Sequence, residues 1–198
     1  MPIHPSAGPA PSSQPVAAAE PVPLVIQPAE PPLKVLMPSA IGDLGLTLVR
    51  NVIIGLRIVP PRAEKRRYMP FEDLENSEYL DEVFGRLSEY FAGARTSPDL
   101  DWDIGPLDLS PFAKRVLKET AKIPHGKTRT YRKIAAAAGR PDAYRQVLAI
   151  LNMNPIPILI PCHRVVTNKS GIGSFIGGKE RKRWLLAMEK RGIQTELV

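Results

Sequence analysis

The residue best suited to chemistry is Cys162, the only cysteine in the chain, which lies in the segment NPIPILIPCHRVV over residues 154–166. A free thiol is only slightly ionised at neutral pH, and the thiolate is its reactive form. His163 follows directly and offers a base, while nearby Arg and Lys side chains favour the anion. A buried structural role is the commoner fate of a lone cysteine. Here the flanking residues are Pro, His and Arg instead of packed aliphatic side chains, which favours a reactive, exposed nucleophile.

The composition excludes several other classes of protein. A single cysteine in 198 residues cannot form an internal disulfide framework. With only Cys162 and three histidines available, His4, His125 and His163, we expect no metal site. No apolar run approaches the length of roughly 18 residues that a membrane-spanning helix needs. The N-terminus lacks the basic and apolar regions of a secretory signal, so we expect an intracellular protein.

The charge of the chain is divided unevenly between its two halves. Residues 1–109 hold 9 Lys and Arg against 15 Asp and Glu, a net charge of −6, whereas residues 110–198 hold 18 against 5, a net charge of +13. A segment this basic suits a polyanion such as nucleic acid. The alternative is a solvated basic face, and because many basic domains bind no nucleic acid, the charge alone favours nucleic acid only modestly.

The first half predicts a Pro-rich tail and a small sheet domain. Residues 1–38 hold 11 of the 22 prolines, so we interpret residues 1–32 as a disordered tail. Three β-prone runs over 33–37, 44–49 and 52–59 predict an antiparallel meander with turns at Gly42-Asp43 and Arg50-Asn51. Pro60-Pro61 ends it, and a charged loop over 62–67 follows. Apolar residues at helical spacing predict a helix over 77–92, and residues 96–109 form an acidic linker that closes the domain 33–109.

The second half, residues 110–198, predicts a mostly helical domain. Ser110-Pro111 starts one helix, residues 130–138 form a short second helix, and Asp142 caps a third that ends near residue 151. The short Gly-containing turn at 139–141 between the last two is typical of a helix-turn-helix, although an ordinary helical hairpin has the same spacing. A Gly-rich loop around Phe175 precedes a basic helix over 179–190.

The chain resembles the O6-alkylguanine-DNA alkyltransferases, the methylated-DNA–protein-cysteine methyltransferases. The segment Ile160-Pro-Cys-His-Arg-Val165 is similar to the active-site motif of that family. The resemblance is strong over about 110–191 and weak over 33–92. Further family motifs occur in the same order and spacing: Ile123-Pro-His-Gly126, Thr130-Tyr131, Ile134-Ala135, Gly139-Arg-Pro141, Arg145, Asn154-Pro155, Gly177-Gly178, and Trp184-Leu-Leu with Glu189.

The resemblance implies a role for four residues around the thiol. Cys162 corresponds to the alkyl acceptor, and His163 to the base that deprotonates it through a water. Glu189 corresponds to the carboxylate that orients the histidine, and Asn154 to the residue that braces the turn. Taken from the residues alone, Glu189 would be interpreted as a solvated helix residue, and Asn154 could be a plain turn residue.

Five further residues correspond to contacts with DNA or the damaged base. Tyr131 matches a tyrosine that presses on the backbone phosphate and contacts the flipped base, although it could also be a core residue. Arg145 matches an arginine that enters the base stack, although it could also be a surface ion-pair partner. Lys182 matches a lysine near the sulfur, Val165 a residue whose backbone contacts the guanine, and Phe175 a tyrosine in the Gly-rich loop.

Some positions depart from the family pattern. Gln146, Leu148, Ile150 and Leu151 stand where the family has mostly small residues after the arginine, and Phe175-Ile176 replace a tyrosine and a small residue. Phe175 therefore lacks a hydroxyl that could bond the base. These changes bear on lesion preference and affinity but not on the type of reaction.

The prediction is an α+β protein with a small three-stranded sheet domain and a winged helix-turn-helix domain. It transfers an alkyl group from O6 of guanine, and from O4 of thymine, to Cys162 once per molecule, without a cofactor. Its partner is alkylated double-stranded DNA, and it acts as a monomer away from membranes. It would be cytoplasmic in a bacterium or archaeon and nuclear in a eukaryote. Two alternatives stay open: a non-catalytic protein that flags alkylated bases, and a transcription regulator with Cys162 as sensor.

Overall fold

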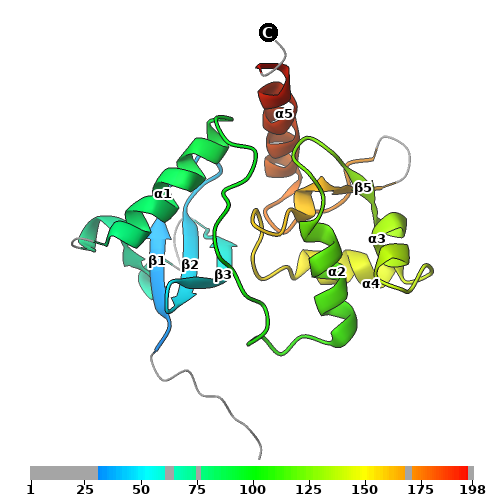
Figure 1. The fold of residues 1–198 in the computed structure, drawn as a ribbon, viewed down its shortest axis with the longest axis horizontal. Coiled ribbons are helices and arrows are strands. Elements are labelled where there is room, and N and C mark those ends of the chain that lie inside the picture. Colours follow the sequence, from blue (N-terminus) through cyan, green and yellow to red (C-terminus); the bar gives the residue numbers. More distant parts are fainter. Residues whose placement is uncertain (1–30, 61–64, 75–76, 168–170, 196–198) are drawn as a thin grey trace, which may run out of the picture.

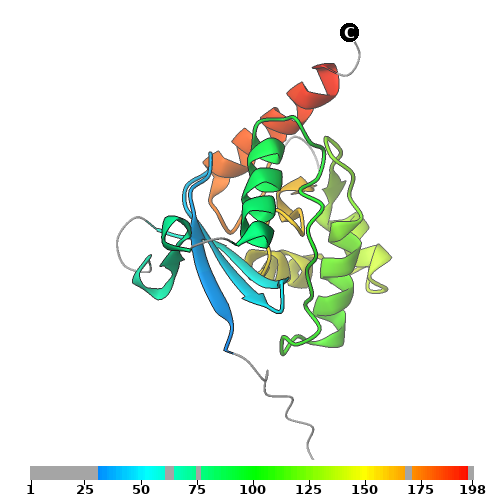
Figure 2. The same ribbon diagram turned by 60° about the vertical axis from the view of Figure 1, so that its left-hand side comes forward.

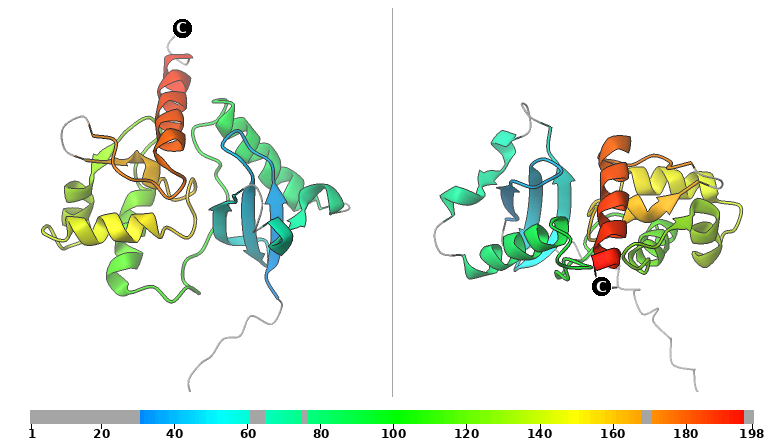
Figure 3. Two further views of the ribbon diagram at one scale, coloured as in Figure 1. Left: turned by 180° about the vertical axis from the view of Figure 1, so that it is seen from behind. Right: turned by 90° about the horizontal axis from the view of Figure 1, so that it is seen from above.

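The computed structural model describes residues 31–60, 65–74, 77–167 and 171–195, and it has two parts with a long helix between them. The N-terminal part holds a sheet and helix α1, and the C-terminal part holds α2, α3 and α4. Helix α5 rises between the two parts (Figures 1 and 3). The α+β class is confirmed. The predicted tail lies outside the described residues, apart from Pro31 and Pro32.

The sheet contains the predicted meander and one additional short strand. β1 (Leu33–Met37), β2 (Leu44–Val49) and β3 (Val52–Ile58) pair antiparallel in sequence order. Arg50 and Asn51 both have positive φ, 49° and 60°, as a two-residue hairpin turn requires. The sequence did not predict β4 (Met69–Pro70), which pairs parallel with the free edge of β1. Two residues that include a proline give too little pattern to identify a strand.

Helix α1 (Glu78–Phe91) covers the sheet with one apolar face (Figure 2). The Ser77 side chain accepts a hydrogen bond from the backbone N–H of Leu80 and caps the helix. Leu80, Val83 and Leu87 are buried, and Tyr90 continues the same stripe at the end of the helix. The helix stops at Gly93, whose φ is +78°.

The segment predicted as an acidic linker is held against the sheet by its backbone. The N–H of Ile53 donates to the carbonyl of Asp101 at 3.0 Å, and the N–H of Asp103 donates to the carbonyl of Ile53 at 3.1 Å. Ile104 then enters the core with 2 % exposure. This segment therefore shields the β3 edge and joins the two parts through shared core packing.

The C-terminal part contains the predicted helix-turn-helix. α2 (Pro111–Ala121) is capped by Ser110, and α3 (Tyr131–Ala137) is capped by Thr130. α4 (Tyr144–Asn152) follows after the turn, but Asp142 does not cap it: the N-cap is Ala143, which has no side-chain acceptor. The expectation failed because the turn ends one residue later than the pattern indicated.

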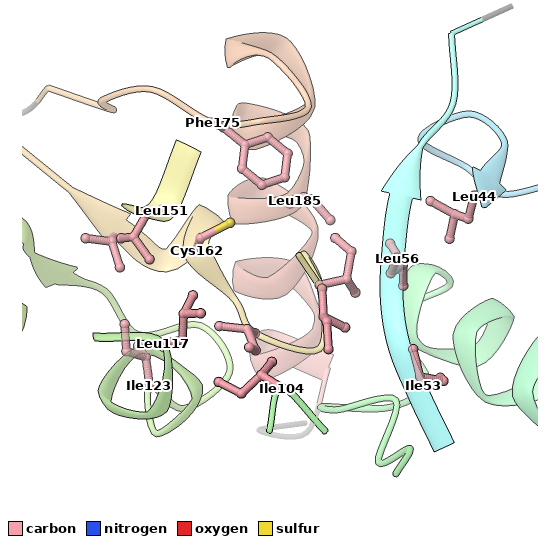
Figure 4. Packing of buried hydrophobic residues seen from close by; sticks show 14 of the residues in the cluster. Leu44, Ile53, Leu56, Ile104, Leu117, Ile123, Leu151, Cys162, Phe175 and Leu185 are labelled. Carbon is pink, nitrogen blue, oxygen red and sulfur yellow. The ribbon is translucent and has the colours of Figure 1, made fainter. Parts of the chain in front are cut away.

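Two short strands and a single turn carry the segment that contains Cys162. β5 (Arg129–Thr130) pairs parallel with β6 (Val165–Val166), and the turn η3 (Cys162–Arg164) lies directly before β6. α5 (Lys179–Thr195) extends beyond its predicted end. In Figure 4, Cys162 lies among buried apolar side chains that include Leu151, Phe175 and Leu185.

Two glycines, one inside α1 and one just after it, test where this helix ends. A Cβ added at Gly85 would meet nothing within 4 Å, so Gly85→Ala should raise the free energy of unfolding by about 0.5–1 kcal/mol, because alanine loses less entropy in a helix. Urea denaturation measures the change. Gly93→Ala, just past the C-terminal end of α1, is the control: its position is equally open but has φ +78°, so the substitution should lower stability. If both substitutions had the same sign, the end of α1 would be wrongly placed.

Candidate active site

The loop before Cys162 is rigid because Asn154 bonds to it at two points. Its Nδ2 donates to the carbonyl of Ile160 at 2.9 Å, and its Oδ1 accepts from the N–H of Ile156 at 3.1 Å. Strand β3 holds the same loop from outside, since the N–H of Leu56 donates to the carbonyl of Pro155 at 2.8 Å. Ile158 has φ +78°, an unfavourable conformation for a β-branched residue. The bracing role predicted for Asn154 agrees with this geometry.

Cys162 is buried, contrary to the exposed thiol that its flanking residues predicted. It is 3 % exposed, and burial raises its pKa to about 11. A hydrogen bond with Asn154, the positive charge of Lys182 and two backbone N–H groups act in the opposite direction without overcoming burial. With its pKa raised to about 11, the thiol is almost entirely protonated at neutral pH and needs a base.

His163 and Glu189 form a buried pair beside the thiol. Nε2 of His163 lies 2.8 Å from Oε1 of Glu189, and neither side chain is exposed. Burial lowers the pKa of His163 despite the nearby carboxylate. Burial alone would raise the pKa of Glu189, but bonds and charges from His163 and Arg164 hold it well below its usual range. An ionised carboxylate accepts, so Nε2 carries the proton and Nδ1 has the free lone pair.

The free nitrogen of His163 is the one that can take a proton. Nδ1 is buried and has no hydrogen-bond partner among the described residues. A neutral imidazole in this tautomer, with its other nitrogen fixed by a carboxylate, is the arrangement that general-base catalysis requires.

Two side chains and one backbone group that bind Glu189 were not predicted from the sequence. Arg164 donates through Nε and Nη2 to the carboxylate at 2.8–3.1 Å, and through Nη1 to the carbonyl of Ile123 at 2.6 Å. The hydroxyl of Tyr90 donates to Oε1 at 2.7 Å. The backbone N–H of Gly126 donates to Oε2 at 3.0 Å. Arg164 lies within the Cys162 motif and could have been singled out there, but nothing in the sequence connects Tyr90 to this group.

Lys182 is a buried lysine that no carboxylate neutralises within hydrogen-bonding distance among the described side chains. Nζ donates to the carbonyls of Val165 and Ser174, at 2.5 and 3.0 Å, and burial lowers its pKa to about 8. Tyr131 lies beside it, 5.9 Å from Nζ to the ring centroid, with its hydroxyl 3.4 Å from the carbonyl of Ser174. The structure therefore brings Val165, Lys182 and Tyr131 together, and the charges of Lys182 and Cys162 are close enough to interact.

The Gly-rich loop packs closely over the histidine. The Phe175 ring lies edge-on to His163, with centroids 6.2 Å apart. Gly177 leaves no room for a side chain, since a Cβ there would lie 2.4 Å from Cδ1 of Ile58 and 2.6 Å from Phe175. The loop is therefore seated against β3 of the N-terminal part.

Arg145 lies apart from the cluster around Cys162, exposed at the start of α4. Its guanidinium is 5.6 Å from the Tyr144 ring centroid, and Arg132 of α3 stacks on the same ring at 4.4 Å. Leu148, one turn further along α4, lines an open hollow of about 740 Å³ together with Ile172, Lys179 and Arg183. The basic residues of the helix-turn-helix thus point outward.

No group of three or more metal-binding side chains occurs among the described residues. Across the same residues, no helix is both long and apolar enough to cross a membrane.

Comparisons with known proteins agree on one family. Residues 111–191 match the family model of the 6-O-methylguanine DNA methyltransferase DNA-binding domain. A methylated-DNA–protein-cysteine methyltransferase of Mycolicibacterium paratuberculosis is 37% identical over 159 residues, 80% of this chain and 93% of that protein. One from Methanosarcina barkeri is 37% identical over 133 residues, 67% of this chain and 82% of that protein.

Solved structures give the same result. The crystal structure of Mycobacterium tuberculosis O6-methylguanine methyltransferase has a TM-score of 0.69 and 34% identity, covering 81% of this chain and 93% of that one. The crystal structure of OGT of the same organism in complex with DNA also has a TM-score of 0.69, at 33% identity, covering 80% of this chain and 93% of that one.

Because Glu189 and His163 are buried, they should link the stability of the fold to pH. Both have folded pKa values below their unfolded ones, so the unfolded chain binds protons more readily and stability is lost as pH falls. Loss should begin near the unfolded value of about 6.5 for histidine and steepen below about 4.3 for the carboxyl. Urea midpoints measured from pH 8 to 3 test this.

Two variants test whether the loss of stability at low pH comes from Glu189. Glu189→Gln should be less stable at pH 7 but show a flatter decline below pH 5, since it has no proton to gain. Glu89→Gln, at an exposed carboxylate paired with Arg95, should keep the wild-type slope. Parallel curves for Glu189→Gln and wild type would contradict the assignment of the depressed pKa to Glu189.

Proposed function

The chain belongs to the methylated-DNA–protein-cysteine methyltransferases, and from that premise we propose that it repairs DNA by moving an alkyl group from O6 of guanine to Cys162. The observation that carries the proposal is the buried chain of contacts from Glu189 to His163 beside the only cysteine in the sequence. A thiol with a pKa raised to about 11 needs such a base to react at neutral pH.

The reaction balances without a cofactor. A water molecule relays the thiol proton of Cys162 to Nδ1 of His163. The sulfur then attacks the alkyl carbon. The S–C bond forms, the C–O6 bond breaks, and its electron pair stays on the guanine, which takes up one proton to regain its keto form. Water at neutral pH does not cleave the S–C bond of the thioether that forms, and the chain has no second cysteine that could accept the alkyl group. Each molecule therefore reacts once.

The other residues near the sulfur support the anion and hold the base. Asn154 and Lys182 both lower the pKa of Cys162 against the effect of burial. Tyr131 and the carbonyl of Val165 would line the space for the flipped guanine, and Phe175 would cover it from the Gly-rich loop. The Val165 carbonyl already accepts a bond from Lys182, so its contact with the guanine would share that oxygen.

A base stacked inside a duplex reaches a buried thiol only after it is flipped out, at a cost of a few kcal/mol. The half with net charge +13 supplies phosphate contacts, and Arg145 is exposed where it could fill the gap in the stack. We extend the proposal to a second substrate, O4 of alkylated thymine. We also propose that residues 33–109 and 110–198 are the two domains. The proposed location is intracellular, cytoplasmic or nuclear according to the organism.

The two rival functions receive less support. A protein that only flags lesions has no use for a thiol beside an oriented base. A regulator would need a dedicated effector region, whereas the likeness to a methyltransferase covers 80% of this chain. The flagging protein predicts lesion binding without alkyl transfer, so a measurement of intact mass distinguishes it from the proposed function.

Intact mass tests the transfer directly. With excess O6-methylguanine duplex, the protein should gain one methyl group, located on the peptide that carries Cys162, and no more with longer incubation. Cys162→Ser should gain none and still bind DNA. His163→Ala should react more slowly, because general-base assistance is worth about 10²–10⁴-fold. Lesion-specific binding with no change in mass would favour the flagging protein instead, and a methyl group elsewhere would rule out Cys162.

Arg145→Ala should leave the fold intact but slow repair of duplex DNA, because flipping loses the side chain that replaces the base. Repair of the free O6-methylguanine base should be unaffected, since no stack has to be opened. Arg95→Ala removes the same charge from the far part of the chain, where Arg95 pairs with exposed Glu89, and should repair duplex DNA normally. Equal rates for both variants on duplex DNA would contradict the role of Arg145.

A further inference from the structure

Tyr90 brings the N-terminal part of the chain into contact with the base of the active site. It is fully buried at the end of α1, which lies beside α5 (Figure 1). Its hydroxyl donates to Oε1 of Glu189 at 2.7 Å and lies 3.5 Å from Nε2 of His163. It also stands outside residues 111–191, the segment that the family model matches.

We propose that Tyr90 is a positioning residue for alkyl transfer: its hydroxyl shares the carboxylate oxygen that holds His163 and thereby sets how strongly His163 attracts a proton. This inference rests on the proposed function, because it concerns the same base. It also means that the sheet domain acts in the activation of Cys162 in addition to supporting the fold.

The direction of the bond follows from its surroundings. Burial and the charge of Glu189 raise the pKa of Tyr90 well above its usual value, so the phenol keeps its proton and donates it. Oε1 then receives three donors: the Tyr90 hydroxyl, Nε2 of His163 and the Arg164 guanidinium. Each donor reduces the negative charge left for the others. Without the hydroxyl, Oε1 would hold the proton on His163 more tightly, and the pKa of His163 would rise.

The charged and titratable groups around His163 come from four elements. Glu189 and Lys182 lie on α5, Cys162 and Arg164 flank His163 in its own turn, and Tyr90 lies on α1. His125, in the turn after α2, faces the Tyr90 ring with centroids 6.2 Å apart. Of these groups, Tyr90 is the one whose polar atom can be removed while its ring and its packing are kept.

The alternative is that Tyr90 only fills space. Its ring packs edge-on against Phe91 at 5.3 Å and against His125. Tyr90→Phe keeps this packing and removes only the hydroxyl. α1 also supplies a matched control: the hydroxyl of Tyr79 is buried and has no hydrogen-bond partner among the described residues, so Tyr79→Phe makes the same chemical change away from Glu189.

The first measurement is the single-turnover rate of methyl transfer from pH 5 to 9, followed by intact mass. For Tyr90→Phe we expect the midpoint of the acid limb to move up by about one pH unit, the size of effect that a hydrogen bond to a charged group produces. The rate should fall up to about tenfold at the acid end and approach the wild-type rate at the alkaline end. Tyr79→Phe should follow the wild-type profile. A purely structural role would instead reduce the rate by one factor at every pH.

The second measurement needs no DNA. In the ¹⁵N-labelled full-length protein at neutral pH, the ring Nε2 proton of His163 should move to lower field in Tyr90→Phe, because its bond to Oε1 strengthens, and should stay in place in Tyr79→Phe. The chain has only three histidines, so substitution of each one assigns the signals. An unchanged His163 signal together with an unshifted pH profile would overturn the role of Tyr90. If the wild-type protein gains no methyl group, the proposed function fails, and the His163 signal alone then decides whether Tyr90 controls the pair.

Discussion

The structure depends on one buried negative charge, the carboxylate of Glu189. Removing an ion from water costs several kcal/mol unless partners replace the lost hydration. Here the partners come from segments far apart in sequence: Tyr90 ends α1, Gly126 lies in the turn after α2, and His163 and Arg164 form the turn after the rigid loop. If any of these segments were displaced, the charge would be left without a partner. The cost of burying Glu189 therefore fixes the relative positions of the sheet domain, the helical domain and the reactive thiol.

Burial of Cys162 explains why its thiol stays unreactive in the absence of a lesion. A pKa of about 11 leaves Cys162 protonated, which protects a group that can react only once from ionisation and oxidation in the absence of a lesion. Lys182, with a pKa of about 8 and bonds to two carbonyls, keeps a positive charge close to the sulfur. The site thus holds the neutral thiol in its ground state and the means to stabilise the anion when the base takes the proton.

Local pattern predicted much of this arrangement. The turn at Arg50-Asn51, the helix predicted over 77–92 and the Pro111 start of α2 are signals between near neighbours, and the structure has each of them. The adjacency of Cys162 and His163 is a signal of the same local kind, and their roles as nucleophile and base stay predictions. Burial of Cys162, the pairing of Asp101 with Ile53, strand β4 and the bond from Tyr90 to Glu189 all depend on contacts between distant segments. The spacing of residues along a sequence carries no information about such contacts. For the same reason, the role of Glu189 was implied by the family resemblance and not by its spacing on a helix.

The contacts between the two halves of the chain explain why their charges can differ so much. The basic half presents Arg132 and Arg145 outward on α3 and α4, whereas the acidic half contacts the loops next to the active site. Leu56 holds the loop before Cys162, Ile58 seats Gly177, and Arg181 donates to the carbonyls of both Ile41 and Gly177. A brace of this kind works through shape and hydrogen bonds and needs no attraction to phosphate. With a net charge of −6 the acidic half would repel DNA, whereas the half with a net charge of +13 attracts it, so electrostatics favours binding through the helical part and leaves the sheet as a support.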